Sequence, residues 1–186
     1  IGDTMVSLSF PSDHGTAIAF KDIFVSDVYG WETVVPPPAT VIDVGAHAGL
    51  FGLATRHYFP SSSIHAYEPN PALWQHLQFQ SRTGSFSCFN EAIGPAEAKA
   101  TLRYPGDSVF TQCVPSPEGE TQVTALSTAI NRIAGRKYVD LLTLDCEGGE
   151  WGILSDQASL ARVHCLTLEY PLFGDHSLEE LARLLE

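Results

Sequence analysis

The residues best suited to chemistry are acids and glycines placed where apolar segments end. Asp43 closes a short β-branched run and is followed by a turn that contains Gly45 and Gly49. Glu68 ends the next apolar segment, nineteen residues after Gly49. A glycine turn between a strand and a helix turns backbone N–H groups toward a ligand, and an acid after the second strand accepts hydrogen bonds from ribose hydroxyls. This spacing predicts a site for a nucleoside cofactor.

The charge of Asp43 distinguishes between the possible nucleoside cofactors. Dinucleotide sites carry the pattern GxGxxG, whereas here three residues separate Gly45 from Gly49 and the acid stands two residues before Gly45. A carboxylate at that point repels a pyrophosphate but attracts an ammonium or a sulfonium group. The sequence therefore favours S-adenosylmethionine, and an NAD-dependent oxidoreductase is the less favoured alternative.

The elements that must position these residues alternate between strand and helix from Thr40 onward. This βαβα order predicts a parallel sheet covered by helices on both faces. The expected strands are 41–44, 63–67, 85–91, 98–104, 121–124, 139–145 and 163–170, and the expected helices are 50–59, 72–80, 126–133, 150–154 and 177–185. Residues 105–120 are expected to form a surface loop, because prolines and glycines interrupt them.

Before Thr40 the pattern differs. Residues 5–10, 16–20 and 23–28 are rich in β-formers and are separated by turn residues, which predicts a small β meander. Three consecutive prolines at 36–38 then form a connector that cannot join a sheet ladder. We therefore expect an N-terminal β extension and connector over 1–38, packed as one compact unit with a cofactor-binding domain over 39–186.

Composition restricts the partners. The 186 residues carry a net charge of −12 and contain ten lysines and arginines in total, which argues against a nucleic-acid substrate. No apolar run approaches the ~20 residues of a membrane span. The four cysteines show no CxxC spacing, so we expect free thiols in a reducing, cytoplasmic compartment. The oligomeric state stays open.

Five motifs in this order resemble the FkbM-type family of class I S-adenosylmethionine-dependent methyltransferases. They are VIDVGAHAGLFGL, HAYEPNP, NEAIG, LLTLDCEGGEWGIL and LTLEYP, and the resemblance covers residues from about 29 to 171. It implies a Rossmann-like class I methyltransferase fold. It also implies O-methylation of a hydroxyl group on a small molecule, natural product, sugar or glycan.

The resemblance assigns cofactor contacts residue by residue. The methionine part is expected to lie on the turn after the first strand, at Asp43, Gly45, Ala46, His47, Gly49 and Phe51. Glu68 is expected to bind the ribose, while Pro69 and Asn70 shape one edge of the adenine site. Asn90, Glu91 and Ala92 are expected to line the other adenine face, and Asp145 is expected beside the transferred methyl group.

Three residues are candidates for the chemistry itself. Methyl transfer to oxygen requires a base for the hydroxyl proton, and Asp145 or Glu147 can serve if neighbouring carboxylates raise its pKa. His47 is a further candidate because its loop lies inside the site. Alternatively, Asp145, Glu147 and Glu169 could hold a divalent cation, but no histidine at metal spacing accompanies them, so no metal site is predicted.

Two features favour a second function class. Thr143 stands where the family usually has lysine, and the chain stops in the helix that should precede strands six and seven, so these closing strands are expected to be missing. A catalytically silent, cofactor-binding partner module is therefore the alternative to an active methyltransferase.

Overall fold

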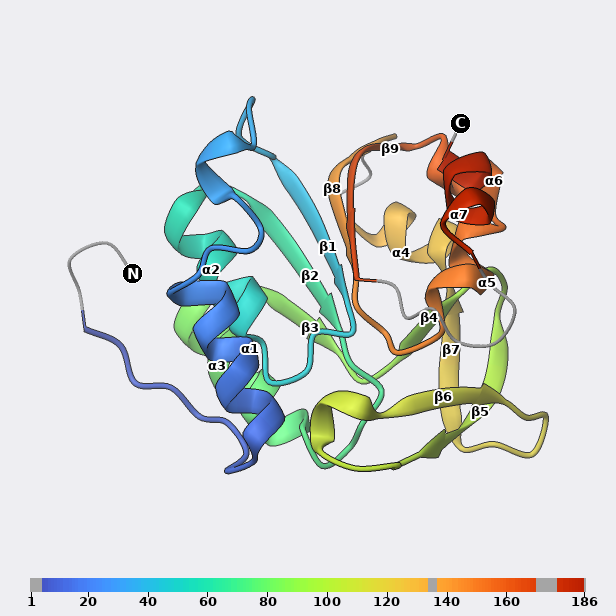
Figure 1. Cartoon of the computed structure of the whole chain (residues 1–186), viewed down its shortest axis with the longest axis horizontal. Helices are drawn as coiled ribbons and strands as arrows, with labels where there is room; N and C mark the ends of the chain where they lie inside the picture. The colour runs from blue at the N-terminus through green and yellow to red at the C-terminus, as the bar shows by residue number, and fades with distance from the viewer. Residues whose placement is uncertain (1–4, 134–136, 170–176, 186) are drawn as a thin grey trace.

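The fold centres on a five-stranded parallel sheet (Figure 1), seen in a computed structural model that describes residues 5–133, 137–169 and 177–185. The strand order is β3-β2-β1-β8-β9, so the chain starts in the middle, moves to one edge and returns to build the other. The strands are β1 (Thr40–Val44), β2 (Ser63–Tyr67), β3 (Ser87–Phe89), β8 (Val139–Leu144) and β9 (Val163–Leu168). This alternating, parallel arrangement confirms the predicted α/β fold with a mostly parallel central sheet.

The central strands bring the acids of the sequence to one edge of the sheet. All five residues of β1 are buried, and Asp43 pairs with Ala66 of β2 and Thr143 of β8. The hydrogen-bond ladder runs on past the strand ends, because Asp145 donates its N–H to Val44 and Glu169 donates its N–H to Leu144. In parallel strands all carboxyl ends point the same way, so these acids converge.

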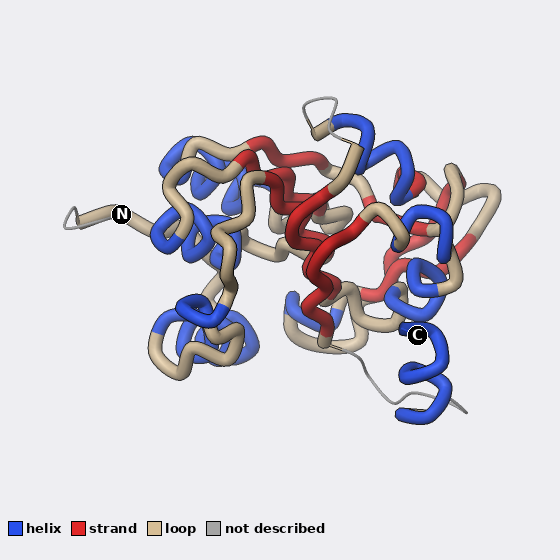
Figure 2. The backbone as a smooth tube through the Cα atoms, turned by 90° about the horizontal axis from the view of Figure 1, so that it is seen from above, coloured by secondary structure: helices blue, strands red, loops and turns tan. Residues whose placement is uncertain are grey.

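Helices cover both faces of this sheet (Figure 2). Alternate side chains of β1 point to opposite faces: Val41 joins a core with α2 and α3, and Ile42 joins a second core with α4, α5 and α7. The first group of helices is α1 (His14–Phe24), α2 (Leu50–Tyr58) and α3 (Trp74–Gly84); the second is α4 (Leu126–Arg132), α5 (Glu150–Leu154), α6 (Gln157–Leu160) and α7 (Leu178–Leu185).

A smaller sheet follows β3, in the order β4-β7-β5-β6. Its strands are β4 (Ala92–Gly94), β5 (Ala98–Arg103), β6 (Gln112–Pro115) and β7 (Thr121–Ala125). The strand predicted over 85–91 is shorter than expected, and β4 separates from it to join this second sheet. The predicted loop 105–120 is wrong in part, because it contains the 3-10 helix η2 (Ser108–Phe110) and β6, which pairs antiparallel to β5.

The predicted N-terminal β meander is wrong. Residues 5–13 form no strand, and the segment assigned to two further strands is the helix α1. Asp13 is its N-cap, with a side-chain oxygen that accepts the N–H of Thr16 at 2.8 Å. Such a cap stabilises a helix start. Packing decides the rest, because Ile23 of α1 is buried in the same core as α2.

The connector between α1 and β1 is anchored by one aromatic residue. Trp31, in the 3-10 helix η1 (Trp31–Thr33), is 1% exposed and stacks on Tyr58 with ring centroids 5.4 Å apart. Its ring also lies 4.9 Å from that of Phe51. The segment before β1 therefore shares a core with α2. A boundary at residue 38 stays a prediction.

The last described helix begins as its sequence predicts. Glu180 donates its backbone N–H to Oγ of Ser177 at 3.2 Å, which is one half of a capping box. The strand expected over 163–170 ends at Leu168, and residue 170 lies outside the described residues. Within the described part of the chain no strand follows β9, and the absence of strands six and seven stays a prediction.

No helix among the described residues has both the length and the apolar character that a membrane crossing requires. The four cysteines, Cys88, Cys113, Cys146 and Cys165, are free, as their spacing predicted.

Candidate active site at the carboxyl edge of the sheet

A cavity of about 380 Å³ opens where the central strands end. Its floor is formed by residues that follow β1, β2 and β8, and its remaining wall comes from α1, the segment after it and η2. Figure 1 shows that these last elements lie far from β8 in the sequence but approach the same edge of the sheet. Small-molecule sites commonly enclose 300–1,000 Å³, so the cavity suits a nucleoside cofactor.

Glycine is required at Gly45 for two reasons. Its φ of 84° is a left-handed conformation that other residues adopt at a cost, and a Cβ added there would lie 1.7 Å from the carbonyl oxygen of Asp145. Gly45 and Ala46 both donate their N–H groups to the carbonyl oxygen of Tyr67. The turn therefore passes directly between the ends of β2 and β8.

Asp43 presents a buried oxygen without a partner. Its side chain is 2% exposed, and Oδ2 has no hydrogen-bond donor within the described structure. Burial raises the pKa of Asp43 well above its usual range, and the nearby Asp145 and Glu68 carboxylates raise it further. A buried carboxylate of this kind is unfavourable alone and is suited to a ligand that carries a cationic donor.

Glu68 links the turn after β1 to the segment after β2. Its Oε2 accepts the backbone N–H of His47 at 2.9 Å, and its Oε1 accepts the N–H of Asn70 at 2.7 Å. Burial raises the pKa of Glu68 to about 7, although the two hydrogen bonds act in the opposite direction. The carboxyl group thus shapes the turn and keeps further lone pairs for a ligand.

Asp145 and Glu147 follow β8 and line the same cavity. Burial is the main cause that raises the pKa of each to about 7, and for both of them Glu169 is the strongest like charge. The backbone of Glu147 has a φ of 55°, a left-handed value that is uncommon for residues other than glycine. The loop therefore holds two carboxyl groups that each gain or lose a proton near neutral pH.

Glu150 builds the loop that carries these acids. It is fully buried and accepts the backbone N–H groups of Cys146 at 2.6 Å and Gly148 at 2.7 Å. Its main role in the structure is to cap the turn between β8 and α5.

His47 connects the turn after β1 to η2 and α1, which line the opposite wall of the cavity. Its Nε2 lies 2.7 Å from Oγ of Ser108 in η2, and that hydroxyl donates to Oδ2 of Asp13, the cap of α1, at 2.5 Å. Burial lowers the pKa of His47 to about 4, so the ring is neutral near pH 7. Three segments distant in sequence meet in this chain of hydrogen bonds.

The structure brings most of the sequence-predicted site residues to one cavity. The lining includes Asp43, Gly45, Ala46, His47, Phe51, Glu68, Pro69, Ala92, Asp145, Glu147 and Glu169. Gly49, Asn70, Asn90 and Glu91 lie outside the lining. Their contacts with a cofactor stay predictions.

Two of these outlying residues have structural partners. Asn70 accepts the N–H of Ala72 at 2.9 Å and donates to Oγ1 of Thr111 at 2.9 Å. Asn90 donates its side-chain amide to the carbonyl oxygen of Glu68 at 2.8 Å. Both amides therefore fix the backbone around Glu68.

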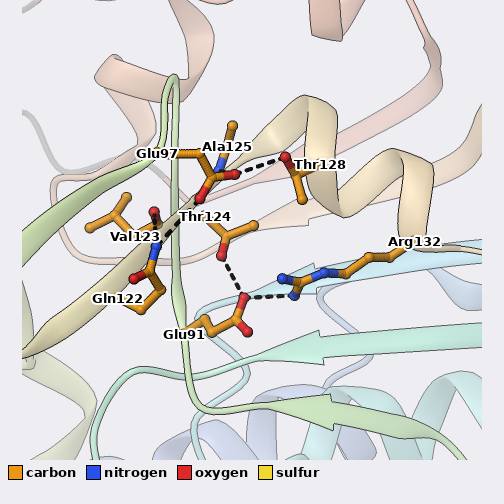
Figure 3. A network of polar contacts seen from close by, with 8 residues as sticks. All are labelled: Glu91, Glu97, Gln122, Val123, Thr124, Ala125, Thr128 and Arg132. Atoms are coloured by element: carbon orange, nitrogen blue, oxygen red, sulfur yellow. Dashed lines mark hydrogen bonds and ion pairs between the residues drawn. The ribbon is translucent and has the colours of Figure 1, made fainter.

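Glu91 belongs to a separate polar network (Figure 3). Its Oε2 lies 2.6 Å from a guanidinium nitrogen of Arg132 and accepts the hydroxyl of Thr124 at 2.5 Å. In the same view Glu97 accepts from Thr128 at 2.8 Å and from the N–H of Ala125 at 3.1 Å. These contacts join β7 and α4 to the loop around β4.

Sequence reasoning missed the wall formed by α1, the segment after it and η2. Asp22, Tyr29, Ser108 and Val109 line the cavity, and none was a candidate. Tyr29 marked the start of the family resemblance, which was the one available signal. Burial raises the pKa of Tyr29 above its usual range, and the charges of Asp145 and Asp43 raise it further. The side chain therefore remains a neutral phenol.

The described residues contain no group of three or more histidine, cysteine, aspartate or glutamate side chains arranged to hold a metal ion. Asp145, Glu147 and Glu169 share the cavity, but their geometry does not form such a group.

The comparisons with known proteins identify the family. The family model described as "Methyltransferase FkbM domain" matches residues 43–186, so the chain belongs to the FkbM methyltransferase family. This match begins at Asp43 and includes the turn, Glu68 and the loop after β8. The sequence-based recognition of this family is confirmed.

Two curated relatives are similar over parts of their length. "AMB antimetabolite synthetase AmbE" of Pseudomonas aeruginosa is 30% identical over 123 residues, 59% of this chain and 6% of that protein. "Methyltransferase 1" of Beauveria bassiana is 26% identical over 160 residues, 72% of this chain and 64% of that protein. The chain thus spans a small part of the first relative and less than two thirds of the second.

Proposed function

We propose that the protein is an S-adenosylmethionine-dependent methyltransferase that methylates a hydroxyl group of a small molecule, natural product or sugar. The observation that carries this proposal is the unpaired, buried Oδ2 of Asp43 at the end of β1. Family membership supports methyl transfer in general. The cofactor and the oxygen acceptor are inferences from the site.

The residues present fit this cofactor. Its ammonium group matches the unpaired carboxylate of Asp43, and its ribose hydroxyls match the lone pairs that Glu68 leaves free. The backbone of Gly45 allows close approach, since its φ and the lack of a Cβ keep the turn narrow. The sulfonium matches the excess of negative charge at Asp145 and Glu147. An NAD pyrophosphate would instead face these carboxylates with the same charge.

When bound, the cofactor supplies an electrophilic methyl group. The chain's own residues then have two tasks, to align the acceptor oxygen and to remove its proton. Asp145 and Glu147 are placed for the second task, because a carboxyl with a pKa of about 7 is half ionised at neutral pH and is a better base than an ordinary carboxylate. His47 is neutral but engaged with Ser108, so its part is to hold the turn.

The names of the two relatives support a general substrate class and no particular acceptor. The name of the fungal relative states methyl transfer, and that of the bacterial one states synthesis of an antimetabolite. We propose a small-molecule or glycan acceptor for this chain. The net charge of −12 argues against a nucleic acid.

Calorimetry and thermal shift with S-adenosylhomocysteine test the cofactor, with Asp43→Asn as the variant. The asparagine side chain would keep the shape but lose the charge, so we expect binding to weaken at least tenfold. Glu118→Gln, an exposed acid outside the cavity, is the matched control. Absence of binding to the unaltered protein at millimolar concentration would refute the proposal. Transfer of a labelled methyl group to any hydroxyl compound would exclude a catalytically silent module.

A further inference from the structure

The cavity holds more carboxyl groups than the proposed cofactor can pair with. Six carboxyl groups line it, and among the described residues no lysine or arginine does; they belong to Asp22, Asp43, Glu68, Asp145, Glu147 and Glu169. S-adenosylmethionine contributes an ammonium, a sulfonium and a carboxylate, a net charge of +1. Asp43 and Glu68 are accounted for by its ammonium and ribose. Four carboxyl groups remain, and the single sulfonium, which faces Asp145 and Glu147, leaves Asp22 and Glu169 without a cationic partner from the cofactor.

These four groups come from separate elements that meet around one aromatic ring. Asp22 is in α1, Asp145 and Glu147 follow β8, and Glu169 follows β9. Tyr29 lies among them, close enough that the charges of Asp22, Asp145 and Glu169 each raise the pKa of its phenol. Its ring is held by an edge contact with Phe51 at 4.9 Å. Carboxylates around an aromatic face are a favourable environment for an alkylammonium group.

Lys21, which forms an ion pair with Asp22, does not occupy this position. Nζ of Lys21 is 3.9 Å from Oδ1 of Asp22, but its side chain is 68% exposed and Lys21 is not part of the lining. An ion pair so exposed is weak and screened by salt. The acceptor side therefore depends on a ligand for its positive charge.

An apolar wall stands beside the acids. Ile18 of α1 and Val109 and Phe110 of η2 line the cavity, and Ile18 and Phe110 are 46% and 49% exposed. The two elements are held together, since Gly15 donates its N–H to Asp107 at 3.1 Å. A hydrocarbon or aromatic group would cover this wall while a charged group reached Asp22 and Glu169.

From this arrangement we infer the class of the methyl acceptor: a hydroxyl compound that also carries a protonated amine and an apolar or aromatic portion. The inference rests on the proposed function, because the acceptor shares its cavity with the cofactor. The amine lies against Tyr29 between Asp22 and Glu169, and the hydroxyl points toward Asp145 and Glu147. Anionic acceptors such as carboxylates and phosphates are excluded by charge.

Three probes of similar size, whose end groups are cationic, neutral and anionic, test the inference. They are 4-hydroxyphenethylamine, 4-hydroxyphenethyl alcohol and 4-hydroxyphenylacetate, titrated into the full chain saturated with S-adenosylhomocysteine at pH 8. We expect the amine to bind at least tenfold more tightly than the alcohol and the acetate to show no binding. Glu169→Gln and Asp22→Asn should each reduce the preference for the amine at least threefold, and Glu118→Gln should leave it unchanged.

The outcomes separate this inference from the proposed function. Binding of S-adenosylhomocysteine with equal or undetectable binding of all three probes overturns the acceptor class but leaves the cofactor assignment standing. A preference for the neutral alcohol also overturns it, and so does a preference for the amine that survives in both variants. Failure of S-adenosylhomocysteine to bind the unaltered protein overturns the proposed function first.

Discussion

The backbone N–H of His47 donates to Oε2 of Glu68 across 2.9 Å, although 21 residues separate the two. The turn after β1 and the acid after β2 are therefore one unit. Asn70 donates its own backbone N–H to the other oxygen of Glu68, Oε1. Glu68 thus stabilises the shape of the cofactor turn whether or not a ligand is present.

Replacing Glu68 by glutamine should affect folding and binding together. One oxygen becomes an NH₂ group that faces either His47 or Asn70, and the backbone N–H there loses its acceptor. An unsatisfied buried donor costs about 1–3 kcal/mol, so we expect the free energy of unfolding to fall by about that amount in a denaturant titration. The affinity for S-adenosylhomocysteine should fall at least tenfold in calorimetry.

Glu97→Gln is the control for this variant. It alters the carboxylate that accepts from Thr128 at 2.8 Å and from the N–H of Ala125 at 3.1 Å, in a part of the chain that does not line the cavity. We expect a loss of stability with unchanged affinity for S-adenosylhomocysteine. Equal loss of affinity in both variants would show that general destabilisation, and not Glu68, controls binding.

The sequence was sufficient to predict the centre of the fold. The strands β1 and β8 are continuous apolar runs, and glycine spacing after β1 identified the turn. Such segments are determined locally and by burial on both faces. The helix α1 was missed because Ile18, Phe20 and Ile23 are also good β-formers; only the cap at Asp13 and packing against α2 select the helix.

The site shows the same difference between residues whose positions follow from local sequence and residues whose positions depend on packing. Asp43, Glu68 and Asp145 stand at strand ends, and a parallel sheet must bring strand ends together. Asp22 and Ser108 lie in segments whose positions depend on how α1 and η2 pack against each other. No local pattern contains that information, so the part of the cavity lined by the strand ends was predictable and the part lined by α1 and η2 was not.

Gly45→Ala should abolish the folded site. The added Cβ would lie 1.7 Å from the carbonyl oxygen of Asp145, and the backbone has a φ of 84°. Gly148→Ala separates strain from clash, because its φ of 105° is unfavourable but nothing lies within 4 Å of the added Cβ. We expect a cost of about 1–2 kcal/mol for Gly148→Ala from strain alone, and at least twice that for Gly45→Ala, measured by denaturation. Equal costs would contradict the close approach.

Asp13→Ala tests the hydrogen-bonded link from α1 and η2 to the turn after β1. It removes the cap of α1 and also the acceptor of the Ser108 hydroxyl, which in turn contacts His47. Asp156→Ala removes a comparable cap from α6, where its side chain accepts the N–H of Ser159 at 3.1 Å. Each should cost about 1 kcal/mol of stability.

The two variants should differ in binding. We expect Asp13→Ala to weaken S-adenosylhomocysteine by threefold to tenfold in calorimetry, because His47 and its loop lose support. Asp156→Ala should bind normally, since α6 does not line the cavity. If both bind normally, the hydrogen-bond chain from Asp13 to His47 has no role in positioning the turn.

The affinity ratio between S-adenosylmethionine and S-adenosylhomocysteine should rise with pH. In the free protein the pKa values of Glu68, Asp145 and Glu147 are raised to about 7, so these groups lose protons between about pH 6 and 8. Only S-adenosylmethionine has a sulfonium, and this positive charge is attracted more strongly to ionised carboxylates than to protonated ones. Calorimetry at pH 6 and pH 8 should therefore show a ratio at least threefold larger at pH 8. A constant ratio would exclude these carboxylates as the partners of the sulfonium.

The ligand-free protein should lose stability as the pH rises from below about 4.5 to about 7. A carboxyl whose pKa is higher in the folded state than its usual value near 4.5 binds more protons when folded. Stability therefore falls as pH rises from about 4.5 to about 7 and changes little above that. Thermal unfolding should show this decrease, and Glu68→Gln should reduce it.

Glu147→Gln and Asp145→Asn should identify the base for the hydroxyl proton. A general base contributes about 10²–10⁴-fold to a rate, so the variant that lacks it should lose kcat by that factor. Since the pKa of each free carboxyl is about 7, kcat/KM of the unaltered protein should rise with pH through this region and then level.

The two carboxyl groups differ in a way that predicts which variant is the more severe. Asp145 directly follows β8 beside Gly45 and the turn after β1, whereas Glu147 lines the cavity two residues further along the loop. Glu147→Gln should therefore remove the rise of kcat/KM with pH and leave S-adenosylmethionine affinity within threefold. Asp145→Asn should weaken that affinity and keep the pH dependence. The reverse pattern would assign the base to Asp145.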